Sequence, residues 1–245
     1  MLLLLPPSET KRDGGVGGSA LDLSLLGFPE LTRPRRAVVS AVRRLSRSVA
    51  GSMTALGLGP TQRFEVERNR ALTVSPVMPA LDRYTGVLFD GLDAASLTVD
   101  ERAYADRHVA IHSALFGVVR ALDPIPAYRL SHNSRLADLS LRRHWAPAIR
   151  AVLDSQRGLL LDLRSESYVA LGPAPAARYI RVVSENAAGR RVALSHDNKR
   201  AKGEFTRAVI ASGIDHPDAD SLLQWAAGSG IRLEPGVPGE LQLIA

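Results

Sequence analysis

The sequence of 245 residues contains no cysteine, and this absence excludes disulfide bonds, thiolate metal ligands and a cysteine nucleophile. A chain without disulfides suits a reducing compartment, so we expect a cytoplasmic protein. No apolar run approaches the roughly 20 residues that span a bilayer, and we expect no membrane partner. The apolar run at residues 1–5 is too short for a signal peptide and continues into Pro6-Pro7, so it predicts a buried strand.

Lysine is also nearly absent. Of the 31 basic residues, 28 are Arg and three are Lys, namely Lys11, Lys199 and Lys202. Lysine is a compact, strongly hydrated charge whose pKa moves readily on burial, and it holds phosphate without the planar fork of Arg. Chance under a codon-biased composition is the alternative explanation, but two lysines in residues 198–207 make that segment the first candidate for a site. The net charge of +6 favours polyanionic partners.

Apolar patterning predicts an α/β (mixed α+β) fold, in which a single domain of residues 1–245 has a mixed central sheet flanked by helices. Strands are predicted at 1–5, 84–89, 159–163, 178–184, 191–196, 231–233 and 241–244. Helices are predicted at 37–50, 62–70, 99–122, 140–156, 198–211 and 221–227. The glycine-rich stretch 12–19 predicts a mobile loop, and it lacks the Gly-Lys-Ser/Thr of a Walker-type phosphate loop.

The helix at 99–122 has the clearest start signal, a capping box from Thr98 to Glu101. On this helix His108 and His112 would face the same way, a spacing that metal-dependent hydrolases use with a Glu after the first His. Val109 stands in that place, so the pair favours a hydrogen-bonded core histidine over a metal ligand. We expect no metal site and no cofactor.

Residues 37–72 form a candidate helix-hairpin-helix element. In such an element, glycines in the hairpin let backbone N–H groups approach a DNA phosphate. A glycine C-cap followed by Pro60 explains the same residues, and this alternative stays open. The residues expected to contact DNA without sequence preference are Gly57, Leu58 and Gly59 in the hairpin and Arg43, Arg44, Arg47, Arg63, Arg68 and Arg70 around it.

The stretch Ser8-Glu9-Thr10-Lys11 matches the S-x-x-K pattern, in which Lys activates a Ser nucleophile. That Ser must open a long helix. Here it follows an apolar strand and precedes a glycine-rich loop, which disfavours acyl-enzyme chemistry.

The other two lysines lie at the start of the helix predicted at 198–211. Asp197, which follows His196, or Asn198 is expected to cap this helix, and Lys199 and Lys202 share one of its faces. Two lysines at a helix start oppose the helix dipole, and an anionic ligand there would relieve this cost. A solvated basic face is the alternative.

Several motifs, in order along the chain, resemble those of a known family. They are Pro6-Pro7-Ser8-Glu9-Thr10-Lys11 after the apolar run, the stretches 84–92 and 115–123, Tyr128-Arg129-Leu130, Ser165-Glu166-Ser167-Tyr168 and Lys199-Arg200-Ala201-Lys202-Gly203. Over essentially the whole chain, the sequence resembles the YaaA family, which is linked to the hydrogen peroxide stress response. The resemblance implies one α/β fold with a positively charged cleft and DNA binding that includes a helix-hairpin-helix element. It also implies a role in limiting oxidative DNA damage by keeping free intracellular iron low.

Carried over by position, the resemblance implies a cleft formed by Ser8, Lys11, Arg120, Tyr128, Arg129, Ser165, Glu166, Tyr168, Lys199 and Lys202. The glycine-rich tract after Lys11 and the arginine-rich Arg200-Ala201-Lys202 depart from the family pattern without removing a charge.

Two functions from different classes fit these residues. The first is a DNA-binding protein of the peroxide stress response without catalysis of its own. The second is an enzyme that binds a small anionic substrate in the cleft, with Glu166 or Tyr168 as acid or base and Lys11, Lys199 and Lys202 as further catalytic candidates. A narrow pocket uniting the lysines favours the enzyme, and an open groove continuous with the Arg63 helix favours DNA. An iron-sequestering protein has little support, because the chain has no Cys and no clustered carboxylates and histidines.

Overall fold

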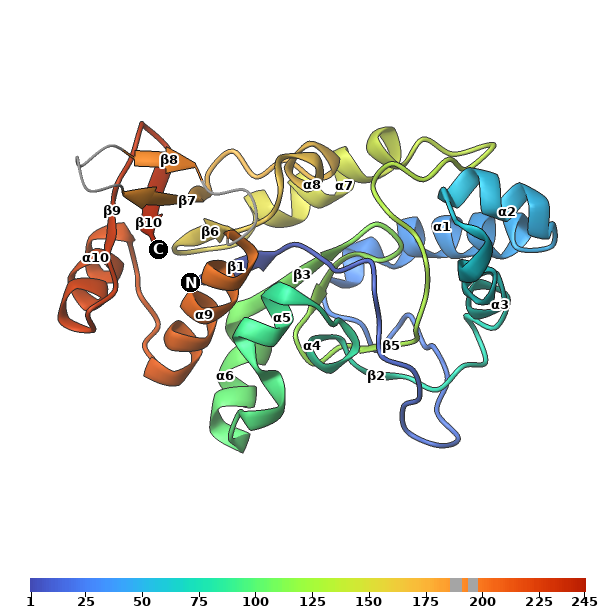
Figure 1. Cartoon of the computed structure of the whole chain (residues 1–245), viewed down its shortest axis with the longest axis horizontal. Helices are drawn as coiled ribbons and strands as arrows, with labels where there is room; N and C mark the ends of the chain where they lie inside the picture. Colours follow the sequence, from blue (N-terminus) through green and yellow to red (C-terminus); the bar gives the residue numbers. More distant parts are fainter. Residues whose placement is uncertain (186–190, 194–197) are drawn as a thin grey trace.

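The first strand of the chain lies at the centre of the sheet. The computed structural model describes residues 1–185, 191–193 and 198–245 (Figure 1). In it β1 (Leu2–Leu5) lies between β3 (Val109–Ser113) and β6 (Leu160–Asp162) and is parallel to both. All four leucines are buried, as expected for a parallel strand covered on both faces. The strands predicted at 1–5 and 159–163 are confirmed.

The sheet mixes parallel and antiparallel strands, in the order β4-β3-β1-β6-β7-β10-β9, with β8 beside β7. The parallel strands are β3, β1, β6, β7 (Arg178–Glu185) and β10 (Glu240–Ile244), and the antiparallel ones are β4 (Gly117–Arg120), β8 (Arg191–Ala193) and β9 (Leu233–Pro235). A separate pair joins β2 (Met78–Pro79) to β5 (Pro124–Ile125). The mixed α/β fold is confirmed. The carboxyl ends of β1, β3 and β6 meet at one edge, where ligands bind in open α/β sheets.

Helices cover both faces of the sheet. In Figure 1, α7 (Leu141–Asp154) and α8 (Glu166–Leu171) lie above it, and α5 (Val87–Leu92), α6 (Val99–His108) and α9 (Asn198–Ser212) lie below it. At one end α10 (Ala219–Gly228) stands beside β9, and α1 (Thr32–Leu45), α2 (Val49–Leu56) and α3 (Phe64–Arg70) group at the other end. The helices predicted at 140–156, 198–211 and 221–227 are confirmed. No helix in the described part of the chain is both long and apolar enough to cross a membrane.

Two glycines hold α9 close to α5. A Cβ on Gly203 would lie 2.0 Å from the carbonyl oxygen of Leu88, and a Cβ on Gly91 would lie 2.8 Å from that of Arg200. Only residues without a Cβ permit this approach. The two helices therefore pack backbone against backbone.

The helix predicted at 99–122 is wrong beyond its first ten residues. α6 begins at the predicted capping box, in which Thr98 and Glu101 each accept the other's backbone N–H. It ends at His108, and the rest of the range forms the antiparallel strands β3 and β4. The apolar residues here are buried on both sides of a sheet, so their periodicity does not distinguish helix from strand.

The strand predicted at 84–89 is also wrong. α4 (Ala80–Arg83) and α5 occupy this region, and between them Tyr84 pairs with Lys11 in an isolated bridge. Tyr84 and Phe89 stack with their ring centres 5.3 Å apart. Their apolar character reflects burial beneath two short helices rather than strand pairing.

The helix predicted at 37–50 is divided into two. α1 (Thr32–Leu45) begins earlier than predicted, with Pro34 in its first turn, and α2 (Val49–Leu56) starts after Ser48, whose Oγ accepts the N–H of Gly51. The next helix, α3 (Phe64–Arg70), lies inside the range predicted at 62–70. A serine cap therefore breaks what the apolar pattern reads as one helix.

The glycine-rich stretch 12–19 is a loop that contains no helix or strand. The Arg83 guanidinium donates to the carbonyl oxygens of Arg12 and Gly14 at the start of this loop and to that of Pro76.

The predicted hairpin of 178–184 with 191–196 is confirmed in its paired strands, β7 and β8. Its turn, His196 and Asp197 lie outside the described residues.

Candidate functional site

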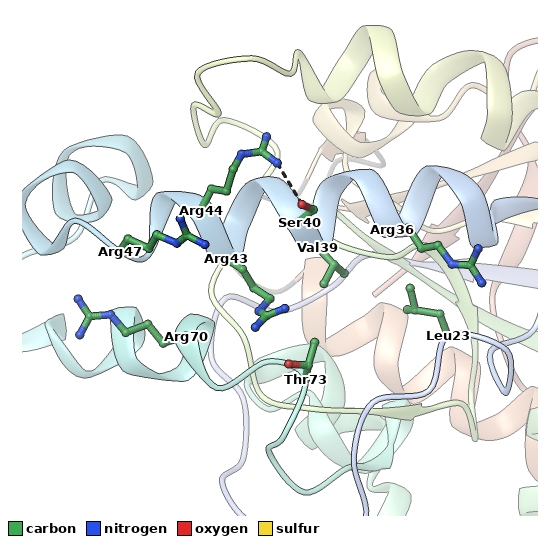
Figure 2. Close-up of a pocket in the computed structure, with 9 residues that line it drawn as sticks. All are labelled: Leu23, Arg36, Val39, Ser40, Arg43, Arg44, Arg47, Arg70 and Thr73. Atoms are coloured by element: carbon green, nitrogen blue, oxygen red, sulfur yellow. Dashed lines mark hydrogen bonds between the residues drawn. The ribbon is translucent and has the colours of Figure 1, made fainter.

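A groove lined by five arginines lies between α1 and α3 (Figure 2). Its volume is about 480 Å³. We call it the arginine groove, and its lining residues are Leu23, Arg36, Val39, Ser40, Arg43, Arg44, Arg47, Arg70 and Thr73. No Asp or Glu is among these lining residues. Two carboxylates outside the lining reach groove arginines: Glu67 accepts from Arg70 Nη1 over 2.6 Å, and Asp138 lies 4.0 Å from Arg44.

Helical spacing explains why α1 forms most of the wall. Arg36, Ser40 and Arg43 follow one another at intervals of four and three residues, which places them on one side of the helix. Arg47 follows four residues later, in the turn after the helix ends. Val38, Ala41 and Val42 are buried against the core on the other side. The apolar face fixes the helix, and the arginine face is thereby held toward the groove.

Three of the groove arginines have no protein partner within the described residues. The exposed side chains of Arg36, Arg43 and Arg47 make no hydrogen bond or ion pair there. By contrast, Arg44 Nη1 donates to Ser40 Oγ over 3.0 Å, and Arg70 Nε donates to the carbonyl oxygen of Ser46 over 2.6 Å. The Arg70 contact ties α3 to the end of α1, and the other three guanidinium groups remain available to a ligand.

The hairpin between α2 and α3 begins with a left-handed helix end. Gly57 has a φ of 64°, and the N–H of Leu58 donates to the carbonyl oxygen of Met53 over 2.9 Å. This is a Schellman-type C-cap. Gly59 and Pro60 follow, and Pro60 opens a short 3₁₀ turn before α3. The geometry agrees both with a glycine cap and with a helix-hairpin-helix element.

Two of the arginines predicted near this hairpin differ in their availability. Arg63 is exposed. Arg68 donates to Asp13 Oδ1 over 2.6 Å and 3.0 Å and to Glu65 Oε2 over 3.0 Å, and its guanidinium carbon lies 4.7 Å from the centre of the Phe64 ring. Arg68 is therefore engaged within the protein.

Lys11 is buried among tyrosines at the carboxyl edge of the sheet. Its Nζ lies 4.2 Å from the centre of the Tyr128 ring and 5.2 Å from that of Tyr84. It donates to the carbonyl oxygens of Ser8 over 2.8 Å and of Glu9 over 3.3 Å. The segment that precedes Lys11 thus folds back over its ammonium group.

The tyrosine hydroxyls beside Lys11 form a short chain. The hydroxyls of Tyr84 and Tyr128 are 2.7 Å apart, and Ser113 Oγ, at the end of β3, lies 2.6 Å from the Tyr128 hydroxyl. Burial raises the pKa of Tyr84 to about 12 and that of Tyr128 well above its ordinary value. Burial also lowers the pKa of Lys11 to about 7, although the charges of Glu65 and Glu9 oppose the change. At neutral pH the tyrosines are protonated and Lys11 is near its titration midpoint.

Arg129 is buried and pairs with Glu9, which precedes Lys11 by two residues. Its Nη2 donates to Glu9 Oε2 over 2.6 Å, and its backbone exchanges hydrogen bonds with the side-chain amide of Asn69 on α3. The Lys11 cluster and the helix that bears the groove residue Arg70 are therefore directly connected.

Tyr168, on α8, is buried among polar side chains. Its ring centre lies 5.1 Å from that of His112 and 5.4 Å from that of His132. Burial raises the pKa of the Tyr168 hydroxyl, so this group is protonated at neutral pH. Burial also lowers the pKa of His112, whose Nδ1 accepts a hydrogen bond from Arg164 over 3.0 Å. His112 is a buried, hydrogen-bonded histidine, on a strand rather than on the predicted helix with His108.

Lys202, on α9, is buried at the same edge of the sheet. Its Nζ lies 5.2 Å from the centre of the Tyr179 ring. Burial lowers the pKa of Lys202 to about 8, while the charge of Asp162, the last residue of β6, raises it. Within the described part of the chain, Nζ makes no hydrogen bond or ion pair. Lys199, one turn earlier, is exposed.

The structure does not bring all the predicted cleft residues together. Lys11 and Lys202 approach the edge from different elements and have different charged neighbours, Glu9, Glu65, Arg68 and Arg129 for Lys11 and Asp162 and Arg181 for Lys202. Ser8 is partly buried beside Lys11, and Ser165 and Glu166 are exposed at the start of α8.

Arg120 lies at the opposite end of the strands. β4 runs antiparallel to β3, and Arg120 pairs with Ala110 near the start of β3. Its guanidinium donates to the carbonyl oxygens of Asp106 and Arg107 and lies 4.9 Å from the centre of the Phe28 ring. Arg120 therefore lies apart from the lysines.

Sequence reasoning did not identify Arg36, Ser40 and Thr73 as groove residues. Arg36 and Ser40 could have been identified from their regular spacing with Arg43 and Arg47, because this spacing places them in the α1 wall. Thr73 gives no such signal, because its place depends on how the chain after α3 packs against α1.

Comparison with known proteins agrees with the motifs found in the sequence. The family model of the peroxide stress protein YaaA matches residues 1–228. UPF0246 proteins of Corynebacterium glutamicum (strain R) and Corynebacterium efficiens are each 41% identical over 239 residues, which is 96% of this chain and 95% of the relative. A UPF0246 protein of Streptomyces coelicolor is 36% identical over 247 residues, covering 98% of this chain and 94% of the relative. With matches of this extent, the chain belongs to the family of the peroxide stress protein YaaA.

Proposed function

We propose that this protein binds DNA without sequence preference through the arginine groove. The observation that carries the proposal is a concave surface with five arginines and no lining carboxylate, on which Arg36, Arg43 and Arg47 have no partner among the described residues. Arginine forms charge-assisted, two-pronged hydrogen bonds with phosphate. Contacts of this kind fix a protein on the DNA backbone without reading its bases.

The groove and the exposed arginine beside the hairpin lie along the same helix, α3, so one DNA backbone can contact both. Arg70 lines the groove from α3, and Arg63 lies seven residues earlier, on the same side of that helix. A phosphate backbone that leaves the groove along α3 would reach Arg63. The backbone N–H groups of Gly57, Leu58 and Gly59 already donate to Thr54, Met53 and Gln62. Arg68 is excluded from this surface by its contacts with Asp13 and Glu65.

Family membership supports a role for this binding in the response to hydrogen peroxide. We propose that the protein limits oxidative DNA damage and free intracellular iron, and that the effect on iron is indirect. Among the described residues, no group of three or more His, Cys, Asp or Glu side chains is arranged to hold a metal ion. In a deletion strain challenged with peroxide, strand breaks and free iron should both rise, and the groove variant described next should not restore either.

The test of DNA binding replaces two groove arginines that have no structural partner. Arg43→Ala combined with Arg47→Ala should weaken duplex binding by roughly tenfold per arginine, measured by fluorescence anisotropy at low salt. The matched control is Arg107→Ala combined with Arg157→Ala, which removes the same charge from exposed positions on α6 and before β6. Equal losses in the two double variants would mean that net charge, rather than the groove, governs binding, and the proposal would be abandoned.

A second candidate function, action on a small anionic substrate, is favoured by one observation. The Lys202 ammonium is buried over the Tyr179 ring and has no hydrogen-bonded or ionic partner in the described residues. An anion beside it would offset the desolvation that lowers its pKa. Glu166, whose charge acts on the Tyr179 beside Lys202, would then supply acid or base function. Inorganic phosphate should raise the thermal midpoint of the wild type and not of Lys202→Met, and an equal rise in both would eliminate this candidate.

A further inference from the structure

An aromatic side chain is exposed next to the arginine groove. Phe64 begins α3 and keeps 51% of its surface exposed, although it is a large apolar residue. Val66 and Asn69 of the same helix are buried, so α3 packs on another side. A packed helix, rather than a loose loop, therefore presents the ring to solvent.

Arg68 covers one face of this ring and is itself fixed. Its guanidinium carbon lies 4.7 Å from the ring centre, and two acidic residues hold the guanidinium group. Asp13 Oδ1 accepts hydrogen bonds of 3.0 Å and 2.6 Å, and the buried Glu65 accepts one of 3.0 Å. Because both sides of the arginine are held, its guanidinium group stays over this face of the ring. Phe64 is thus a flat platform with a covered face and an open one.

The platform continues the line of basic residues that leaves the groove. Arg63 immediately precedes Phe64 and is exposed, and Arg70 lines the groove from the same side of α3 as Arg63. Arg70 donates to Ser46 and Glu67 but keeps 37% of its side chain exposed. A strand whose phosphates pass along Arg70 and Arg63 therefore brings its bases within reach of Phe64. Proteins hold single strands by this combination of a basic track and an aromatic ring that stacks on a base.

We propose that Phe64, backed by Arg68, stacks on an unpaired nucleobase of DNA bound along the arginine groove. The inference rests on the proposed DNA-binding function and adds the form of DNA that the site recognises. Bases inside a duplex are already stacked on both faces, whereas a base in a single strand or bulge offers a free face. Every base has such a face, so the ring selects unpaired structure rather than sequence.

The test separates stacking from apolar contact. Phe64→Leu retains an apolar side chain beneath Arg68 but removes the aromatic face, and Phe64→Trp retains a face. Fluorescence anisotropy measures the binding of a single strand and of the duplex of the same sequence. Each strand has about 20 nucleotides, a length that exceeds the span of known single-strand sites. Phe64→Leu should weaken single-strand binding by about 5- to 150-fold and leave duplex binding within about twofold. Phe64→Trp should bind like the wild type. Val99→Ala, which trims another exposed apolar side chain, on α6, is the control and should change neither.

A direct readout of stacking completes the design. The fluorescence of a 2-aminopurine placed in a one-base bulge should be quenched by the wild type and by Phe64→Trp but not by Phe64→Leu. Unchanged single-strand binding in Phe64→Leu would overturn the inference, and the proposed function would stand if the Arg43/Arg47 double variant still lost duplex binding. Equal losses on both forms of DNA with a lowered thermal midpoint would show a structural role and also overturn it. If the wild type bound neither form, the proposed function itself would fail.

Discussion

Lys11 should make the protein more stable as the pH rises above neutrality. Burial lowers its pKa from 10.5 to about 7 in the folded protein. Between these two values the unfolded chain holds a proton that the folded protein has released, so the free energy of unfolding increases with pH. The contribution is smallest below about pH 7 and complete above the pKa of the unfolded state.

The size of the effect follows from these pKa values. One released proton changes the free energy of unfolding by at most about 1.4 kcal/mol per pH unit. Because Lys11 is half deprotonated near pH 7, its integrated contribution from about pH 7 to 9 is about 2 kcal/mol. Lys202, whose pKa is lowered to about 8, adds about 1 kcal/mol over the same range. Burial raises the pKa of Tyr84 and Tyr128, and both keep their protons throughout.

The assay is urea unfolding at several pH values in this range. The wild type should gain about 3 kcal/mol in total, whereas Lys11→Met should retain only the part from Lys202, about 1 kcal/mol. Lys202→Met is the matched control and should retain the part from Lys11, about 2 kcal/mol. Met is chosen because it keeps the length and apolar stem of Lys without its charge.

An identical pH dependence in the wild type and Lys11→Met would refute this reasoning. It would mean that the Ser8 and Glu9 carbonyls and the Tyr128 ring keep the ammonium group protonated through the whole range. Lys11 would then be a permanently charged structural residue.

Two other properties can be predicted from the structure. Gly203→Ala should lower the free energy of unfolding by about 1–3 kcal/mol or more, because its Cβ would lie 2.0 Å from the Leu88 carbonyl oxygen. Gly228→Ala, where a Cβ meets nothing within 4 Å, should not destabilise the protein, and a similar loss there would discredit the packing argument. For duplex DNA, the slope of log affinity against log salt should be less steep by about 1.8 in the Arg43/Arg47 double variant than in the wild type. An unaltered slope would mean that neither arginine contacts phosphate.

The central strands could be predicted because their residues fit no other secondary structure. Four consecutive leucines before two prolines are too few for a helix, so residues 1–5 form a strand. The range 99–122, by contrast, is long enough to form either a helix or strands. After His108 its apolar residues fill both faces of a sheet, and a pattern without a polar face fits a helix equally well. Only the pairing of β3 with β1 and β4, which is a long-range contact, decides between them.

The sequence predicted which residues belong to the candidate site, but not which side chains surround them. The scarcity of lysine pointed to Lys11 and Lys202, and both are buried at the carboxyl edge of the sheet. That Tyr84 and Tyr128 enclose Lys11 depends on segments far away in the sequence. The same is true of the arginine groove. The spacing of residues along α1 predicts one wall, but the position of Arg70 from α3 in the other wall depends on tertiary packing.

The central position of β1 has a consequence for biosynthesis. β1 leaves the ribosome well before its neighbours β3 and β6, and the second of these ends at Asp162. At ordinary translation rates the four leucines wait roughly 8 to 30 s before both neighbours have been made. During that time they expose two unpaired strand edges, which is a known risk for aggregation. The yield of this protein in cells should therefore depend on chaperones that bind nascent chains more than on the stability of the finished fold.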